Sequence, residues 1–344
     1  MAHKASLRYL RVILKDKVEL SKAVIVSSSK NQALNLSLLR ATTRDYFTPP
    51  HPRYISILLS YGLGSRATAA TAIDALMNRL QSAKDSSVAI KCLVIAHHIM
   101  KHGSFILVDQ LTVYPNSGGR NYLNLSKFRD SSSLVAWELS SLVRWYARFL
   151  EHQIRTSRVL GFVLSSTANA VEREKVKEKI RTQTNIDLIH EMEHLVALLE
   201  DCCKRPEPLL RSNKMVDQIW DMVGQDVKDL MDVISDRVVE FHHRLGCLSF
   251  NNSIDLASVL KRLEGCKQGI AAMSLGTMDS LWLHLIDLKQ KIERHKPLNA
   301  AMDRGLLSSR GEEQWSLSQR FHGDVVKQDD RLKVRSARFN RDGF

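Results

Sequence analysis

The sequence predicts an all-α protein, in which a helical solenoid continues into an antiparallel helical bundle. Through about the first 300 residues, apolar side chains recur every three or four positions, which is the period of one helix face. No stretch of that span alternates apolar and polar residues between hairpin turns, as strands would. One segment, VAIKCLVIAHHIM from Val88 to Met100, is apolar on nearly every side and is expected to be the buried central helix.

An amphipathic helix is expected from Ser6 to Leu20. Its apolar residues at helical spacing are Leu7, Leu10, Leu14 and Val18, and a basic stripe of Arg8, Arg11 and Lys15 runs beside them. We expect this helix to pack on the solenoid through its apolar side while its charges face solvent. The alternative is that the basic stripe contributes to a lipid-facing surface.

A proline-rich loop separates two helices between Leu38 and Tyr54. Pro49, Pro50 and Pro52 cannot continue a helix. Pro52 suits the first turn of the next helix, because its missing N–H would have no helical partner there.

Basic and hydrogen-bonding side chains are concentrated in the same stretch. Arg40 and Arg44 are four residues apart, which predicts that they share one helical face. His51, Arg53 and Tyr54 lie where the following helix is expected to expose free backbone N–H groups. A loop of this composition at a helix N-terminus can bind several phosphates of one ligand.

The first lobe is completed by three further helices. Ser65 is a suitable N-cap for an alanine-rich helix that runs to Leu80, and Gly103 ends the central helix. The closing helix has apolar residues at steps of four, three, four and three, namely Val135, Leu139, Leu142, Tyr146 and Phe149. A polar break at 165–169 predicts a boundary, so that the first lobe covers residues 1–165.

A second lobe, residues 166–300, is expected to be a helical bundle. Its longest helix keeps a three-four rhythm over roughly seven turns, with apolar positions Val216, Ile219, Val223, Val227, Leu230, Ile234, Val238 and Phe241. Segments Ile186 to Leu199 and Leu256 to Ile270 are expected to cover that stripe. Beyond Asn299, glycine, serine and mixed charges leave too few apolar residues for a core, which predicts a mobile tail at 301–344.

Composition restricts the class of partner and the compartment. The formal net charge of +13 favours an acidic partner, either an anionic membrane or a nucleic acid. Five cysteines show no CxxC spacing, which indicates reduced thiols in a cytoplasmic protein. No run of about 18 apolar residues is present, so any membrane contact is expected to be peripheral.

One motif suggests an enzyme. His190-Glu-Met-Glu-His194 is an HExxH sequence on an expected helix, in which the histidines could bind zinc and Glu191 could act as a base. Glu200 is too close to be a downstream ligand, and no HxxGxxH continuation follows. We therefore interpret the motif as a chance match on a solvated helix face, with a zinc peptidase as the alternative.

Other site hypotheses rest on fewer features of the sequence. His97, His98 and His102 could ligate a metal, but a buried core histidine hydrogen-bonded to neighbouring backbone is the expected arrangement. The GLGS sequence at Gly62 lacks the strand and the third glycine of a dinucleotide site. Nucleic-acid binding rests on net charge alone, without a zinc-finger spacing or an aromatic platform. We expect no metal, no cofactor and no nucleic-acid partner.

The loop sequence resembles a family signature. Arg40-Ala-Thr-Thr43, then prolines, then His51, Arg53 and Tyr54, is similar to the Lys-Ala-Thr-(Thr/Asn)-His, proline, Lys-x-(Lys/Arg)-(His/Tyr) pattern of clathrin-assembly proteins. In that family the pattern lies in the ANTH domain and holds the head group of an inositol phospholipid. Matches to the family's central helix are Lys91, Leu93, His97 and Gly103, and residues 121–130 and 144–150 repeat family phrases.

The resemblance implies a right-handed ENTH/ANTH-like solenoid and a non-enzymatic endocytic adaptor. By residue match, Arg40, Arg44, His51, Arg53 and Tyr54 would bind a phosphoinositide such as phosphatidylinositol 4,5-bisphosphate. It also implies promotion of clathrin coat assembly, with clathrin and an adaptor complex or SNARE cargo as partners. The expected location is cytoplasmic, on coated pits of the plasma membrane, on coated vesicles and on the Golgi.

The last residues lack the coat-binding motifs that are typical of the family's tails. Residues 301–344 contain no NPF, DPF or DLL sequence. Leu285-Ile-Asp-Leu288 is similar to a clathrin box, but it is followed by Lys289 instead of an acid, and its helical spacing predicts buried leucines. We therefore expect weaker clathrin binding than in a relative whose tail carries several motifs.

Overall fold

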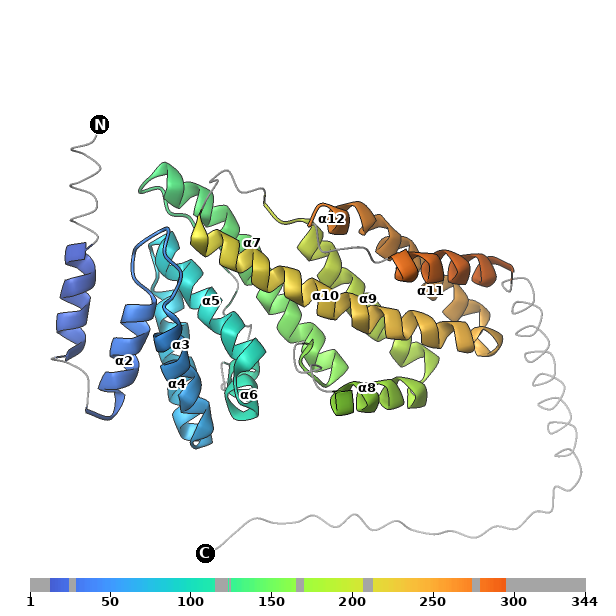
Figure 1. Cartoon of the computed structure of the whole chain (residues 1–344), viewed down its shortest axis with the longest axis horizontal. Coiled ribbons are helices and arrows are strands. Elements are labelled where there is room, and N and C mark those ends of the chain that lie inside the picture. The colour runs from blue at the N-terminus through green and yellow to red at the C-terminus, as the bar shows by residue number, and fades with distance from the viewer. Residues whose placement is uncertain are drawn as a thin grey trace, which may run out of the picture.

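The computed structural model of the chain describes residues 13–24, 29–114, 123, 125–164, 170–206, 213–273 and 279–294. Every regular element in these residues is a helix, and the helices form a solenoid that runs into a bundle (Figure 1). The predicted all-α class is therefore confirmed. The expected tail at 301–344 and the apolar residues Leu7 and Leu10 lie outside the described residues.

The helices are unequal in length, and the two longest cross the middle of the molecule (Figure 1). They are α2 (Ser29–Ala41), α3 (Pro52–Ser60), α4 (Arg66–Gln81), α5 (Ser86–His102), α6 (Phe105–Val113), α7 (Leu134–Leu160), α8 (Ala170–Thr182), α9 (Asn185–Cys203), α10 (Lys214–His243), α11 (Phe250–Gly265) and α12 (Lys267–Ala271). Short 3₁₀ turns, η1 (Tyr61–Leu63) and η3 (Leu245–Cys247), follow α3 and α10, and residues 13–24 and 279–294 form further helices. None of the described helices combines the length and apolarity needed to cross a membrane.

Helix α5 is the central helix of the first lobe, as predicted. Nearly all of its side chains are buried, and it packs against α4 and α7. Before it, Gly62 of the GLGS sequence lies against the start of α6, where a Cβ would clash with Ser104 Oγ, which donates a hydrogen bond to the Gly62 carbonyl (2.6 Å). That glycine is therefore explained by close packing and not by a nucleotide.

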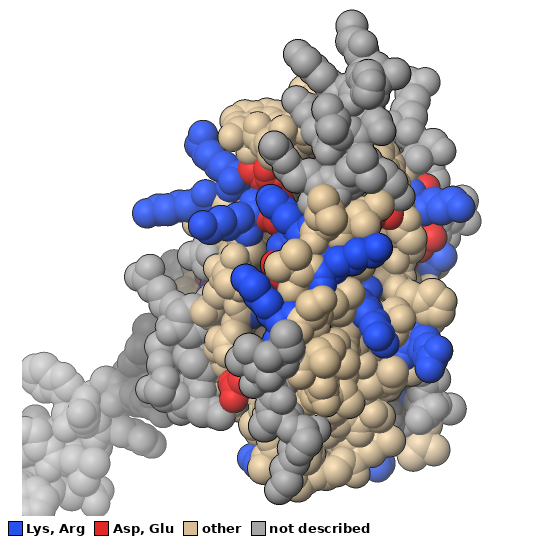
Figure 2. All heavy atoms as spheres, turned by 90° about the vertical axis from the view of Figure 1, so that its left-hand side faces the viewer, with Lys and Arg blue, Asp and Glu red and all other residues tan. Residues whose placement is uncertain are grey.

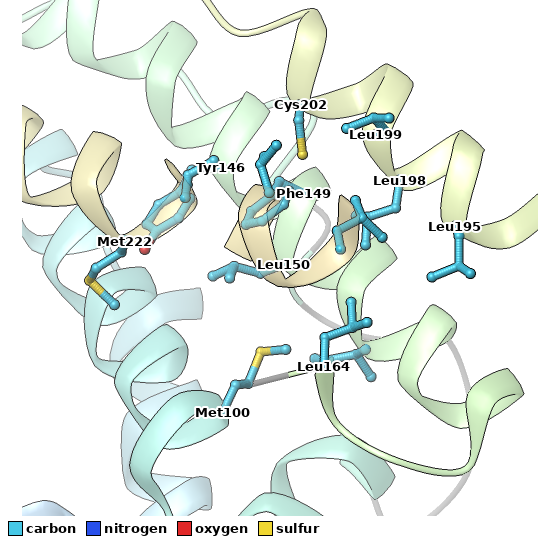
Figure 3. Packing of buried hydrophobic residues seen from close by; sticks show 14 of the residues in the cluster. Met100, Tyr146, Phe149, Leu150, Leu164, Leu195, Leu198, Leu199, Cys202 and Met222 are labelled. Atoms are coloured by element: carbon cyan, nitrogen blue, oxygen red, sulfur yellow. The ribbon is translucent and has the colours of Figure 1, made fainter. Parts of the chain in front are cut away.

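Helix α7 joins the first lobe to the bundle, because it packs against α5 and also against α9. Figure 3 shows Tyr146, Phe149 and Leu150 of α7 between Met100 of α5 and the leucines of α9. One continuous hydrophobic core thus crosses the predicted boundary at residue 165, and the division into lobes remains a prediction.

The long helix of the bundle is also confirmed. All eight apolar positions expected between Val216 and Phe241 are buried on α10. Helix α9 packs against α7, α10 and α11, so it covers the stripe of α10 as expected, whereas the expectation that Leu256 to Ile270 covers the same stripe is wrong, because α11 packs chiefly on α9. Burial in this bundle comes from the three-four spacing alone, since each inward stripe needs a facing helix.

The helix at 13–24 differs from the expectation. Leu14 and Val18 are 60% and 50% exposed, so its predicted apolar side is not packed on the solenoid at these positions. The helix is held instead by Asp16 and Glu19, whose carboxylates pair with arginines of the solenoid. A charged contact has therefore replaced the hydrophobic one that the spacing suggested.

Candidate anionic-ligand site at the loop end

The segments that precede α3, α5, α7 and α10 meet at one end of the molecule, which we call the loop end (Figure 1). Tyr46 Oη lies 3.5 Å from Ser132 Oγ, and Asn213 Nδ2 donates to the Tyr46 carbonyl (3.1 Å). The Ser86 N–H donates to Asp130 Oδ2 (2.8 Å). The loop end thus gathers several helix N-termini, each of which carries partial positive charge.

Helix α3 begins at Pro52, as predicted, and His51 is its N-cap. The Arg53 N–H donates to His51 Nδ1 (3.2 Å), and the Tyr54 N–H donates to the His51 carbonyl (3.0 Å). The expectation of free backbone N–H groups here is therefore wrong at these two positions, because the cap satisfies them. Side chains remain available: His51 and Arg53 are exposed, and Tyr54 is half-buried with its ring centroid 5.8 Å from that of His51.

Arg40 reaches the same region from α2. It lies one residue before the end of α2, it is exposed, and α2 packs against α3. The loop from Thr42 to His51 returns the chain from the end of α2 to the start of α3, so Arg40, His51 and Arg53 belong to one end of this helix pair (Figure 1). Arg40, Arg53 and His51 are therefore exposed at the same end of the α2–α3 pair, and their joint role in a site stays a prediction.

Arg44 is not part of that exposed group, and its assignment as a ligand-binding residue is corrected here. Helix α2 ends at Ala41, so Arg44 does not share a helical face with Arg40. Its side chain is 10% exposed and pairs with Asp16 Oδ1 (2.6 Å), Asp85 Oδ2 (2.9 Å) and Glu19. Burial alone would lower the pKa of Arg44, but hydrogen bonds to these carboxylates raise it above the ordinary arginine value. Its donors are already in use.

We call Asp16, Glu19 and Asp85 the carboxylate clamp. Besides Arg44, it holds Arg79, whose Nη1 lies 2.9 Å from Glu19 Oε2. Burial raises the pKa of Glu19, whereas the hydrogen bond from Arg44 and the charge of Arg79 lower it by more. Sequence reasoning missed the clamp, and the one available signal was the placement of two acids three residues apart among the basic residues of the first helix.

A cavity of about 640 Å³ lies beside the clamp, between the helix at 13–24 and the turn before α5. Three exposed lysines, Lys15, Lys22 and Lys84, are among the residues that line it. Figure 2 shows Lys and Arg side chains gathered on the face that this first helix and α2 present. The face formed by this helix and α2 is therefore basic, although Arg44 and Arg79 are paired with carboxylates.

Behind the loop, Lys91 of α5 is almost completely buried. Its ammonium donates to Thr43 Oγ1 (2.8 Å), so it supports the loop from the inside. Burial lowers the pKa of Lys91 to about 8, with Asp45 and Asp16 opposing that shift. The sequence indicates Lys91 only as a family match, because periodicity does not say which polar residue of a buried helix lies behind the loop.

The HExxH motif does not form a metal site. His190 is exposed and His194 half-buried, but Glu191 is turned inward, where it accepts from Arg237 Nε (3.2 Å) and from Gln183 Nε2 (2.5 Å). Its carboxylate is therefore not available to act as a base on metal-bound water. Among the described residues, no group of three or more His, Cys, Asp or Glu side chains could hold a metal ion.

His97 is a buried core histidine, as expected, but its partners are side chains instead of backbone. Its Nδ1 lies 2.8 Å from Tyr146 Oη, and its Nε2 lies 2.6 Å from Asp226 Oδ2. Asp226 also accepts from Lys101 and from Gln153 Nε2 (3.1 Å). Burial raises the pKa of Asp226, but His97 and Lys101 lower it by more, so that Asp226 remains ionised. This network ties α5, α7 and α10 together.

The all-helical solenoid that runs into a bundle is the architecture of the ENTH/ANTH-like helical domains. The ANTH domain family matches residues 33–269, and the chain belongs to this family. Among similar Arabidopsis thaliana proteins, each called "Putative clathrin assembly protein", At4g40080 is 47% identical over 274 residues, which are 78% of this chain and 75% of that protein. At5g10410 is 30% identical over 81% of this chain and 84% of its own length. At5g57200 is 25% identical over 72% of this chain and 42% of its own length.

Proposed function

We propose that the protein is a non-enzymatic, peripheral membrane adaptor that binds phosphoinositide head groups at its loop end and takes part in clathrin coat assembly. The observation that carries the proposal is the group formed by Arg40, His51 and Arg53. These side chains are exposed around the start of α3, with no ion pair to any described residue. Tyr54 beside them supplies a hydroxyl for a further hydrogen bond. Membership of the ANTH family supports the same assignment.

The geometry favours recognition by side chains. Because the His51 cap occupies the first N–H groups of α3, a phosphate would be bound by the guanidinium groups of Arg40 and Arg53 and by Nε2 of His51. The positive end of the α3 dipole adds to their attraction. At about 1 kcal/mol per cation near an anionic surface, the two arginines give roughly 2 kcal/mol, and His51, whose Nδ1 accepts from the Arg53 N–H, adds a hydrogen bond through Nε2. A single molecule would therefore bind weakly, and many copies in one coat would bind stably.

The proposed clathrin role depends on family membership and on the names of the relatives. An adaptor complex or SNARE cargo would be further partners, and coated pits, coated vesicles and the Golgi would be the locations. The clathrin-box-like segment is not an accessible motif, since Leu285 and Leu288 are 1% and 0% exposed, as the spacing predicted. A pull-down with the clathrin terminal domain should retain the full chain weakly, and removal of residues after Asn299 should change that little. Strong retention that the truncation abolishes would place a coat-binding motif in the removed segment.

Liposome co-sedimentation tests the head-group site. Arg40→Ala with Arg53→Ala should reduce sedimentation with phosphatidylinositol 4,5-bisphosphate vesicles by about thirtyfold, if each cation contributes about 1 kcal/mol. His51→Asn is the suitable third change, because asparagine keeps the N-cap that alanine would remove. Arg158→Ala with Lys261→Ala removes the same charge from exposed positions elsewhere and should bind like the wild type. Equal loss in both double variants, or competition by duplex DNA as strong as by inositide, would contradict the proposal.

A further inference from the structure

Three large apolar side chains are exposed at the loop end, close to the proposed head-group site. Phe47 is 50% exposed in the loop before α3, and Leu134 and Trp137 are 75% and 52% exposed on the first turns of α7. Single exposed apolar residues are ordinary, but several at one end of a molecule form a surface that favours a partner. Leu134 and Trp137 share one face of α7, since they are three residues apart.

The backbone that carries these side chains is well fixed. The Asp45 carboxylate accepts from the Phe47 N–H (3.1 Å), which holds the loop in a tight turn. Ser133 caps α7, and the contact of Tyr46 with Ser132 joins the loop to the start of that helix. The three apolar groups are thus held on adjacent, capped segments instead of on a fraying end.

Exposed cations outnumber exposed acids at the end that carries this apolar surface, where Asp217 on the first turn of α10 is an exposed acid. The exposed cations of the loop end and its flanking segments are Arg40, Arg53, Lys84, Lys127, Arg129 and Lys214. Two carboxylates of the same end are occupied internally, since Asp85 pairs with Arg44 and Asp130 accepts from the Ser86 and Ser132 N–H groups. An apolar patch on an end of the molecule with an excess of exposed cations complements a surface that is anionic outside and apolar beneath, which is the interface of an anionic membrane.

We propose that Phe47, Leu134 and Trp137 form a shallow wedge that enters the boundary between lipid head groups and acyl chains. The inference rests on the proposed function, because the cations bring this end of the molecule to the membrane. The wedge adds apolar burial to that attraction, and tryptophan suits the depth because its ring is amphipathic. Removing all three side chains should weaken vesicle binding by at least about tenfold, given the apolar area that insertion would bury.

The full chain with Phe47→Ser, Leu134→Ser and Trp137→Ser tests the wedge. Binding of the protein is measured on vesicles of phosphatidylcholine and phosphatidylserine, with and without phosphatidylinositol 4,5-bisphosphate. Binding of soluble inositol trisphosphate to the protein is measured by calorimetry. We expect vesicle binding to fall at least about tenfold while inositol trisphosphate binding and the melting temperature stay unchanged. The matched control is Leu63→Ser with Phe105→Ser, which removes two side chains that are each 81% exposed, one in η1 and one at the start of α6, at the far end of α3 and α5. It should bind like the wild type.

The depth to which Trp137 enters the membrane is measured separately, by quenching of tryptophan fluorescence with brominated lipids. The difference between the wild type and Trp137→Phe isolates Trp137, and shallowly brominated chains should quench it more than deeply brominated ones. Full vesicle binding by the triple variant, an unquenched Trp137, or no binding to any vesicle overturns the wedge. Loss of vesicle binding in the Leu63 and Phe105 control would overturn it as well. Quenching of Trp137 on phosphatidylserine vesicles without any inositol trisphosphate binding would instead overturn the head-group site and support the wedge.

Discussion

Two exposed arginines at the loop end and two buried charged residues on the inner face of α10 have opposite environments. Arg40 and Arg53 at the loop end are exposed and have no ion pair to a described residue. On α10, Arg237 is 1% exposed and pairs with Glu191, and Asp226 is 3% exposed and pairs with His97. Arg237 carries the same charge as Arg40 and Arg53, but only the two exposed arginines can meet a ligand. Burial and internal partners, rather than residue type, therefore separate binding residues from structural ones.

Arg44 shows that this difference also holds within the loop end. It is only four residues from Arg40, yet three carboxylates neutralise it. A stretch of sequence that is rich in basic residues can thus contain both a candidate ligand-binding residue and a structural residue. The following predictions test which charged residues bind a ligand and which stabilise the fold.

The largest effect is expected at Arg237. Arg237→Ala would leave the Glu191 carboxylate buried without its main partner, and breaking a buried ion pair in this way costs about 3–5 kcal/mol. Chemical denaturation followed by circular dichroism measures the loss. The double variant Arg237→Met with Glu191→Leu removes both charges and should recover most of the stability. A loss below about 1 kcal/mol in the single variant would mean that the pair does not hold α9 to α10.

A smaller but still large loss is expected at Arg44, and it sharpens the contrast with Arg53. Arg44→Ala should destabilise the fold by about 2–4 kcal/mol, because the three clamp carboxylates would repel one another without it. Arg53→Ala should change stability by less than about 0.5 kcal/mol and weaken inositide binding about fivefold. Each variant is assayed both by denaturation and by vesicle sedimentation. Unfolding of the Arg53→Ala variant would show that Arg53 is a structural residue. Loss of inositide binding by Arg44→Ala at unchanged stability would show that Arg44 is a binding residue.

Lys91 provides a prediction about pH. Its pKa falls from an ordinary value near 10.4 to about 8 in the folded protein, so the unfolded chain binds more protons between these values. Its contribution to stability is therefore complete above about pH 10 and is lost as pH falls through 8. Lys91→Met removes this titration, so the stability of the wild type relative to the variant should rise from pH 8 to pH 10. A pH-independent difference between the two unfolding free energies would show that Lys91 is not desolvated.

The fold could be predicted because its cause is local. The stripe from Val216 to Phe241 has the helical period in the sequence itself, and every member is buried in α10. The roles of charged residues could not be predicted in this way, because their partners are distant in the chain. Arg44 meets Asp16 and Asp85, 28 and 41 residues away, and Arg237 meets Glu191, 46 residues away. Periodicity specifies which face is buried, but it does not specify which carboxylate a buried arginine will find.

The smallest effect is expected at the two histidines of the HExxH motif. His190 is exposed and His194 half-buried, and their rings contact each other with centroids 4.8 Å apart. Burial and the neighbouring His190 lower the pKa of His194, which favours its neutral form near neutral pH. His190→Ala with His194→Ala should therefore change the free energy of unfolding by less than about 0.5 kcal/mol and leave vesicle binding unchanged.

Metal analysis of the purified protein is the decisive measurement for this motif. We expect no stoichiometric zinc, since Glu191 is held by Arg237 and cannot act as a base on a metal-bound water. Stoichiometric zinc in the wild type that is absent from the double variant would contradict this expectation. It would mean that Glu191 can leave Arg237, and it would support the peptidase hypothesis.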